Sequence, residues 1–124
     1  MLEIGKAATA STVVSEKNTA KAVGSGSLDV FSTPMMIALM EQAACECIAE
    51  SLEPGQSSVG TQVEVAHTAA SPIGATITAT AIIDNIDGRS ITFSVSASDG
   101  TNQIGNGKHT RVIINTERFM AKLV

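Results

Sequence analysis

The chain has 124 residues, with 12 acidic and 8 basic side chains and neither tryptophan nor tyrosine, and we expect residues 1–124 to form a single domain. No basic run is interleaved with aromatic side chains, which argues against a nucleic-acid surface. No apolar run is long enough to span a bilayer, and the N-terminus lacks the basic and apolar regions of a signal peptide. We therefore expect neither a nucleic-acid partner nor a membrane partner.

The first predicted element is a strand over residues 8–15, which are rich in small and β-branched side chains. Residues 16–22 fit either a turn or a continuation of that strand. Glycine and serine alternate in residues 24–27, which predicts a flexible loop leading into the next element.

Residues 30–53 contain the only long helical pattern in the chain. Thr33 stands where its hydroxyl can cap a helix, Pro34 follows at a position that needs no amide donor, and Pro54-Gly55 ends the pattern. Residues 35–40 are apolar on every side, which predicts a helix that is buried all round. One carboxylate, Glu41, follows this apolar run, where a charge is costly unless it is paired or used.

Cys45 and Cys47 lie two positions apart on the predicted helix and point to nearly opposite sides, so they cannot form a disulfide with each other. Reduced thiols are typical of the cytoplasm, and the sequence therefore predicts a cytoplasmic protein. We find no set of convergent metal ligands and expect neither a metal nor another cofactor.

Four alternating patterns predict strands after the helix, at residues 58–68, 75–86, 89–98 and 101–116. In the first of them, alternation places Val59, Thr61, Val63, Val65 and His67 on one face. Asp87-Gly88 and Asp99-Gly100 predict hairpins, and Ser71 to Gly74 predicts a turn. The stretch Gly105-Asn106-Gly107 predicts a bulge or a close approach of two backbones.

A strand, a long helix and an antiparallel meander together predict an α+β fold in which a curved sheet wraps around one long central helix. Such a sheet keeps open edges. We therefore expect a homodimer or a higher homo-oligomer that continues the sheet or packs helices together.

Glu41 and His67 are the side chains that most need an explanation. His67 follows Val63 and Val65 on its strand face, so it should point at the helix rather than at water. A buried histidine is usually a satisfied core residue, but a carboxylate on the facing helix leads us to predict an acid–base pair. Thr33 fits two roles, a helix cap alone or a hydroxyl that orients a substrate carbonyl or a water.

His109 and Arg111 share one face of the last predicted strand. Arg111 could meet a carboxylate or a phosphate, although a solvated surface charge is the common case. The chain has no Gly-x-Ser-x-Gly motif, which argues against a serine hydrolase.

Several stretches resemble one known family. They are VFSTPMMIALME at 30–41, LEPG at 52–55, VGT at 59–61, VAHTAA at 65–70, SASDG at 96–100 and IGNGKHTR at 104–111. In these motifs and the spacings between them, residues 30–122 resemble the hotdog-fold thioesterases that are similar to fluoroacetyl-CoA thioesterase.

The resemblance implies a hotdog domain that dimerises with active sites at the interface and hydrolyses a small or medium acyl-CoA thioester. The family's catalytic Thr, Glu and His correspond to Thr33, Glu41 and His67. Its strand glycine and last-strand arginine correspond to Gly60 and Arg111, which we expect to bind the substrate.

In the fluoroacetyl-specific enzyme, the lid segment before the helix is longer and rich in aromatic side chains. Here residues 21–29 are short and no aromatic side chain precedes Phe31. The resemblance thus implies the general chemistry without implying fluoroacetyl specificity. We expect Phe31 to line the acyl pocket. The candidates for contacts with CoA are Arg89, Lys108, Arg111, Arg118 and Lys122.

Two other functions fit the same residues. A hydratase or dehydratase of an acyl thioester also needs a histidine and an acid, and a non-catalytic protein could hold an acyl-CoA or another small ligand in the same pocket. The first would add water to an enoyl thioester without releasing a thiol. The second would be stabilised by its ligand without turning it over.

Overall fold

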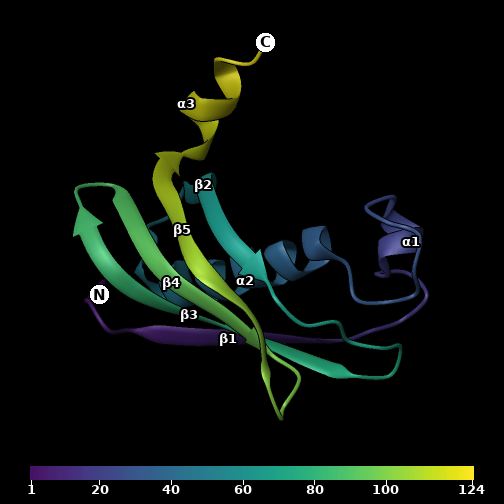
Figure 1. Cartoon of the computed structure of the whole chain (residues 1–124). Coiled ribbons are helices and arrows are strands. Elements are labelled where there is room, and N and C mark those ends of the chain that lie inside the picture. The colour runs from purple at the N-terminus through teal and green to yellow at the C-terminus, as the bar shows by residue number, and fades with distance from the viewer.

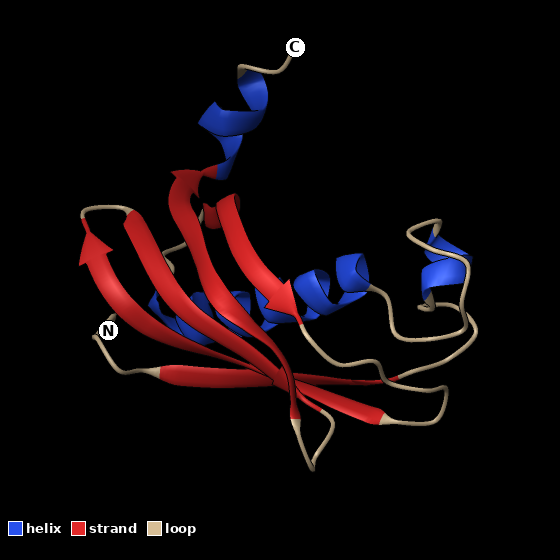
Figure 2. Ribbon diagram, in the orientation of Figure 1, coloured by secondary structure: helices blue, strands red, loops and turns tan.

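The computed structural model describes residues 1–124 as one curved antiparallel sheet around a long helix, as Figure 1 and Figure 2 show. In chain order the elements are β1 (Ala7–Val13), α1 (Ala20–Val23), α2 (Thr33–Ile48), the short 3₁₀ helix η1 (Ala49–Ser51), β2 (Gln56–His67), β3 (Thr76–Asp87), β4 (Ser90–Ser98), β5 (Gln103–Asn115) and α3 (Thr116–Ala121). The strand order is β1-β3-β4-β5-β2, so β1 and β2 form the two open edges. This is the α+β architecture that the sequence predicts.

The core lies between α2 and the concave face of the sheet. Alternate side chains of β3 and β4 are buried there, as the sequence predicts: Ile77, Ala79, Ala81, Ile83, Ile91, Phe93, Val95 and Ala97. Ala43 and Ala44 of α2 are also fully buried. Small side chains on both sides of this contact let the helix approach the sheet closely.

The predicted turns are also confirmed. The β3–β4 and β4–β5 connections each contain a glycine with positive φ, Gly88 at 61° and Gly100 at 94°. The ambiguous segment before the first loop is a turn followed by the short helix α1, whose first turn is capped by Thr19. No helix of the structure has both the length and the apolar character needed to cross a membrane.

The N-cap of α2 is Ser32 rather than Thr33, which corrects the sequence interpretation. Ser32 has an extended backbone, and its Oγ accepts a hydrogen bond from the Met35 amide at 3.3 Å. Its own amide donates to the Asn18 carbonyl, which fixes how the chain enters the helix. Thr33 is therefore the first helical residue, and its hydroxyl is not used for capping.

The prediction that α2 is buried all round is wrong for the single chain. Met36 and Leu39 are buried, but Pro34, Met35 and Ala38 are exposed. The physical reason is that a five-stranded open sheet covers only one side of a helix. An apolar strip of α2 is left facing outward along its first turns.

A bulge in β2 changes which of its residues face the helix. The register with β5 shifts between Gly60 and Gln62, so Gly60 pairs with Arg111 while Val63 pairs with His109. Paired residues point to the same side of a sheet. Gly60 and His67 therefore lie on the same face, although strict alternation along β2 would put an even-numbered and an odd-numbered residue on opposite faces. The predicted face is correct for Val63 and His67 and wrong for the residues before the bulge.

The predicted close backbone approach in β5 is confirmed. A Cβ added to Gly105 would lie 2.6 Å from Met36 Sδ and 2.8 Å from the Ala66 carbonyl oxygen. One added to Gly107 would collide with the Glu64 carbonyl oxygen. Next to Gly105, the pairing with β4 shifts by one residue, which is the bulge that the same motif predicts. These glycines let β2, β5 and α2 meet at one place.

Candidate active site

The N-terminus of α2 meets the C-terminal end of β2 at a hydrogen bond between two predicted site residues. Thr33 Oγ1 lies 2.8 Å from His67 Nδ1. The other ring nitrogen, His67 Nε2, is buried and has no hydrogen-bond partner in the protein. Burial lowers the pKa of His67, and the Ala69 backbone opposes this only in part. His67 is therefore a neutral imidazole at neutral pH with one nitrogen unused.

A pocket of about 250 Å³ opens beside this pair. Thr33 and His67 form part of its wall, and Phe31 supplies an aromatic side chain. The remaining wall comes from Val30, Ala20 and Ser25 and from residues 68–70 after β2. Its walls are mostly apolar, which suits a small acyl group more than a charged one.

Glu41 belongs to a second cluster two turns further along α2. Its Oε2 accepts a hydrogen bond from Arg111 Nη1 at 3.0 Å. Arg111 is 7% exposed, so the solvated surface charge that is the common case for arginine does not apply here. Ser58 of β2 holds the rest of the guanidinium, because its Oγ accepts from Nε at 2.9 Å and its carbonyl accepts from Nη2 at 3.1 Å. The second carboxylate oxygen, Oε1, makes no hydrogen bond and no ion pair, and the side chain of Glu41 is 38% exposed.

His109 completes this cluster, and the sequence analysis gave it no role. Its Nδ1 lies 2.8 Å from the Gln62 carbonyl, which can only accept, so Nδ1 carries the proton. Its Nε2 therefore accepts from Arg111 Nη1 at 3.1 Å. Burial lowers the pKa of His109, with a smaller contribution from the positive charge of Arg111, against the opposing effects of Gln62 and Glu41. A neutral His109 makes no ion pair with Glu41, although Nε2 and Oε2 are 3.7 Å apart. The one sequence signal for the burial of His109 was that it shares a strand face with Arg111.

Gly60 is the residue that lets the carboxylate reach β2. A Cβ at this position would lie 2.6 Å from Glu41 Oε2, 3.1 Å from His109 Cε1 and 3.3 Å from Arg111 Nη1. A side chain at position 60 would push the Glu41 carboxylate away from Arg111. The absence of a side chain at Gly60 is therefore part of the geometry of the site.

The structure does not bring all the predicted site residues together within one chain. It joins Thr33 to His67 and joins Glu41 to Arg111 and Gly60. Thr33 and Glu41 are eight residues apart on α2, which is about 12 Å along the helix axis. The predicted acid–base pair of Glu41 with His67 is therefore not formed in the single chain.

The cysteines take no part in either cluster. Cys45 is exposed and Cys47 is buried, and the two are not bonded to each other. Burial raises the pKa of the Cys47 thiol, which makes it a poor nucleophile. No three His, Cys, Asp or Glu side chains lie close enough together to hold a metal ion.

A central helix wrapped by a curved antiparallel sheet is the hotdog fold, and the solved structures that share it with this chain place the chain among the hotdog-fold thioester hydrolases. The family model for the fluoroacetyl-CoA-specific thioesterase matches residues 14–117, and the chain belongs to this family. The resemblance seen in the sequence is confirmed.

Three relatives illustrate this similarity. The fluoroacetyl-CoA thioesterase of Streptantibioticus cattleyicolor is 46% identical over 95 residues, which cover 77% of this chain and 68% of the relative. A variant of fluoroacetyl-CoA thioesterase, solved in complex with fluoroacetate and CoA, superimposes with a TM-score of 0.90 at 38% identity, covering 95% of this chain and 99% of that chain. A thioesterase superfamily member from Thermus thermophilus superimposes with a TM-score of 0.91 at 26% identity, covering 99% and 91%.

Proposed function

We propose that this protein hydrolyses small or medium acyl-CoA thioesters, with Thr33, Glu41 and His67 acting at an interface between two copies of the chain. The observation that carries the proposal is that each cluster leaves one reactive atom unused. Oε1 of Glu41 makes no hydrogen bond or ion pair, and His67 Nε2 has no hydrogen-bond partner. Family membership adds the substrate class, since a relative has been solved with CoA bound.

The reaction needs a nucleophile, a proton acceptor and a place for the leaving sulfur. In the proposed route, Glu41 Oε1 takes a proton from a water whose oxygen bonds to the thioester carbon. The tetrahedral intermediate then collapses, the C–S bond breaks, and the electron pair leaves on sulfur. His67, with its proton on Nε2 and with Thr33 donating to Nδ1, donates a hydrogen bond to the leaving sulfur, and the proton that Glu41 took from water passes to the thiolate, which restores the carboxylate. The products are a carboxylic acid and the CoA thiol.

Attack by Glu41 itself is the alternative route to the same products. The carboxylate would then form an anhydride that water cleaves. A single turnover in ¹⁸O-water separates the two routes, because only the anhydride route leaves the label in the Glu41 side chain when water attacks the anhydride on the glutamyl carbon. Label found only in the released acid excludes cleavage of an anhydride at the glutamyl carbon.

The dimer part of the proposal starts from the outer edge of β2. This strand has no neighbour on one side, and residues 60–64 are exposed along it. The exposed strip of α2 with Pro34, Met35 and Ala38 lies on the same molecule without a cover. Antiparallel pairing of β2 with the same strand of a second copy would satisfy the open backbone groups and cover apolar surface.

This pairing also reduces the distance between the two clusters. Within one chain, Gly60 and His67 are seven residues apart, or about 20 Å along an extended strand. If the pairing is centred near Gln62, Gly60 lies only about 10 Å along the strand from His67 of the partner subunit. Glu41 of one subunit then faces the Thr33–His67 pair of the other, and each active site takes residues from both chains.

Thiol release from a panel of acyl-CoA substrates tests the proposed activity. We expect release of free CoA from one or more short or medium acyl thioesters, measured with a thiol-trapping dye. Consumption of an enoyl thioester without thiol release would instead indicate a hydratase. Thermal stabilisation by acyl-CoA without any turnover would indicate a binding protein.

A heterodimer of two inactive variants tests the shared site. We expect one subunit with Glu41→Gln and one with His67→Ala, purified together through two different tags, to recover about half of the wild-type kcat per dimer. One of its two sites would contain both native side chains. If each site were built within one chain, the heterodimer would be as inactive as its parents, and a monomer in native mass spectrometry would also refute the arrangement.

A further inference from the structure

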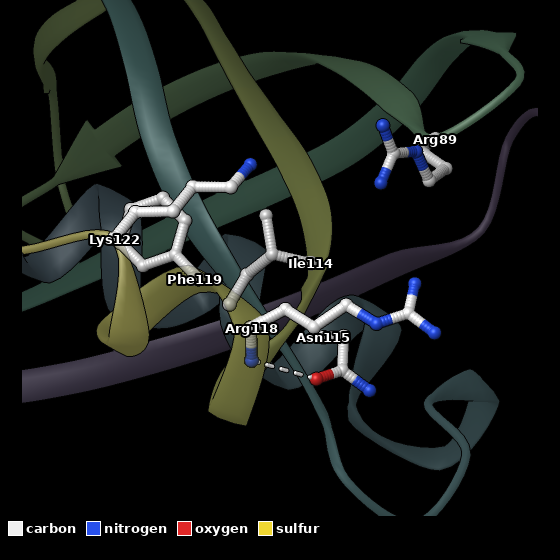
Figure 3. Close-up of a pocket in the computed structure, with 6 residues that line it drawn as sticks. All are labelled: Arg89, Ile114, Asn115, Arg118, Phe119 and Lys122. Atoms are coloured by element: carbon white, nitrogen blue, oxygen red, sulfur yellow. Dashed lines mark hydrogen bonds between the residues drawn. The ribbon is translucent and has the colours of Figure 1, made fainter.

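A second pocket, far along β5 from the pocket beside His67, gathers three exposed cations. It has a volume of about 150 Å³ and is lined by Arg89, Ile114, Asn115, Arg118, Phe119 and Lys122 (Figure 3). Arg89 comes from the connection between β3 and β4, and the other residues come from the end of β5 and from α3. Arg118 and Lys122 are four residues apart, so they face the same side at the end of α3.

The three cations of this pocket are not neutralised by the protein. The ion pairs in the chain are those of Lys108 with Asp84 and of Glu41 with Arg111, together with the approach of His109 to Glu41. Neither Asp87 nor Glu117, their nearest acidic neighbours in sequence, pairs with them. The chain as a whole is acidic, with a formal net charge of −4, so a pocket with three unpaired cations is a local exception. Such a site attracts an anion with more than one charge.

An aromatic ring stands beside these charges. The chain has three phenylalanines and no tryptophan or tyrosine, and Phe31 and Phe93 are both buried. Phe119 is half-exposed, and it lines this pocket. Purine rings stack on aromatic faces, while phosphates pair with arginine and lysine. Cations and a stacking ring together fit a phosphorylated nucleotide.

We propose that this pocket binds the phosphorylated nucleotide end of the CoA substrate, with Arg89, Arg118 and Lys122 on the phosphates and Phe119 against the adenine. The inference rests on the proposed acyl-CoA hydrolysis. Of the five basic residues that are candidates for CoA contacts, Lys108 and Arg111 already have partners in the fold. Only the three in this pocket are free.

The position of the pocket suits this role in the proposed dimer. Ile114 pairs with Ser57, near the start of β2. When β2 pairs with its copy around Gln62, the start of β2 at Ser57 lies beside the end of the partner's strand, which carries His67 of the partner subunit. Two strand spacings, about 10 Å, then separate the backbone of Ile114 from the backbone of that histidine at the end of the sheet. The pantetheine arm is about as long as an extended chain of four to five residues, or about 15 Å. It can therefore reach from this pocket to the active site containing the partner's histidine.

Paired substrates with and without the nucleotide test the pocket separately from the chemistry. We expect the double variant Arg118→Ala, Lys122→Ala to raise KM for the preferred acyl-CoA by roughly tenfold or more, because two charge-assisted contacts are lost. Its kcat should not change. Its kcat/KM for the matching acyl N-acetylcysteamine thioester, which has no phosphates, should equal that of the wild type. Phe119→Ala should show the same substrate dependence with a smaller effect.

Lys17→Ala is the control, because it removes one exposed positive charge far along the chain from the pocket. It should leave both substrates unaffected. An equal change for both substrates, or no change for acyl-CoA, would overturn the pocket assignment while leaving the hydrolase intact. If the wild type hydrolyses no thioester, calorimetric titration with CoA alone still decides the question, since weaker binding by the double variant supports the pocket and equal binding refutes it.

Discussion

Replacing Glu41 with glutamine is expected to lower kcat for thioester hydrolysis by about 10²–10⁴-fold, the range typical for loss of a positioned acid–base group. The amide keeps an oxygen that can accept from Arg111 Nη1, so the guanidinium retains its contact with α2. It has no basic oxygen that can take a proton from water or attack a carbonyl. We therefore expect a folded protein with nearly normal KM and little turnover, measured by thiol release.

The choice of glutamine over alanine follows from Arg111. This guanidinium is nearly buried, and removing the whole carboxylate would leave its charge without a counterion, which destabilises a fold. Glu50→Gln is the matched control, because it makes the same change at an exposed position just beyond the end of α2. Full activity in a folded Glu41→Gln protein would remove Glu41 from the mechanism.

Most of the fold could be predicted because its signals are local. Alternating side chains defined the buried faces of β3 and β4, and glycine-containing turns defined their hairpins. The errors arose where two local choices were equally good. Ser32 and Thr33 both make suitable caps, and the choice between them depends on a hydrogen bond from Ser32 to the distant Asn18 carbonyl. The bulge at Gly60 depends on how β2 pairs with β5, and the sequence of either strand alone does not show that pairing.

The sequence singled out candidate site residues one by one but did not give their arrangement. Glu41, His67 and Thr33 stood out because each is a polar group in apolar surroundings. Their partners are remote in sequence: Arg111 is 70 residues from Glu41, and Thr33 is 34 residues from His67. We predicted a Glu41–His67 pair because we placed both side chains on facing surfaces of the same chain. The fold instead leaves these two side chains in separate clusters, beside a strand edge that has room for a second copy.

Replacing His67 with asparagine is expected to lower kcat by about 10²-fold or more, because the nitrogen that faces no protein group disappears. The asparagine oxygen can occupy the place of Nδ1 and accept from Thr33, so the helix–strand contact survives. In the wild type, burial holds the pKa of His67 below its usual value. The neutral form thus persists as the pH falls below 6.5, and kcat/KM should decline only at more acidic pH, as the imidazole takes up a proton.

The acid limb of this pH profile identifies the histidine responsible, because the chain has only two. In His67→Asn the residual activity should lose the limb. In His109→Asn the limb should remain, since that change keeps a donor for the Gln62 carbonyl and removes only the acceptor for Arg111. If His109→Asn abolishes the limb and His67→Asn preserves it, the titrating group is His109. Protonation there would replace a hydrogen bond to Arg111 with repulsion, and the hydrogen-bond donor to the leaving sulfur would have to be sought elsewhere than at His67.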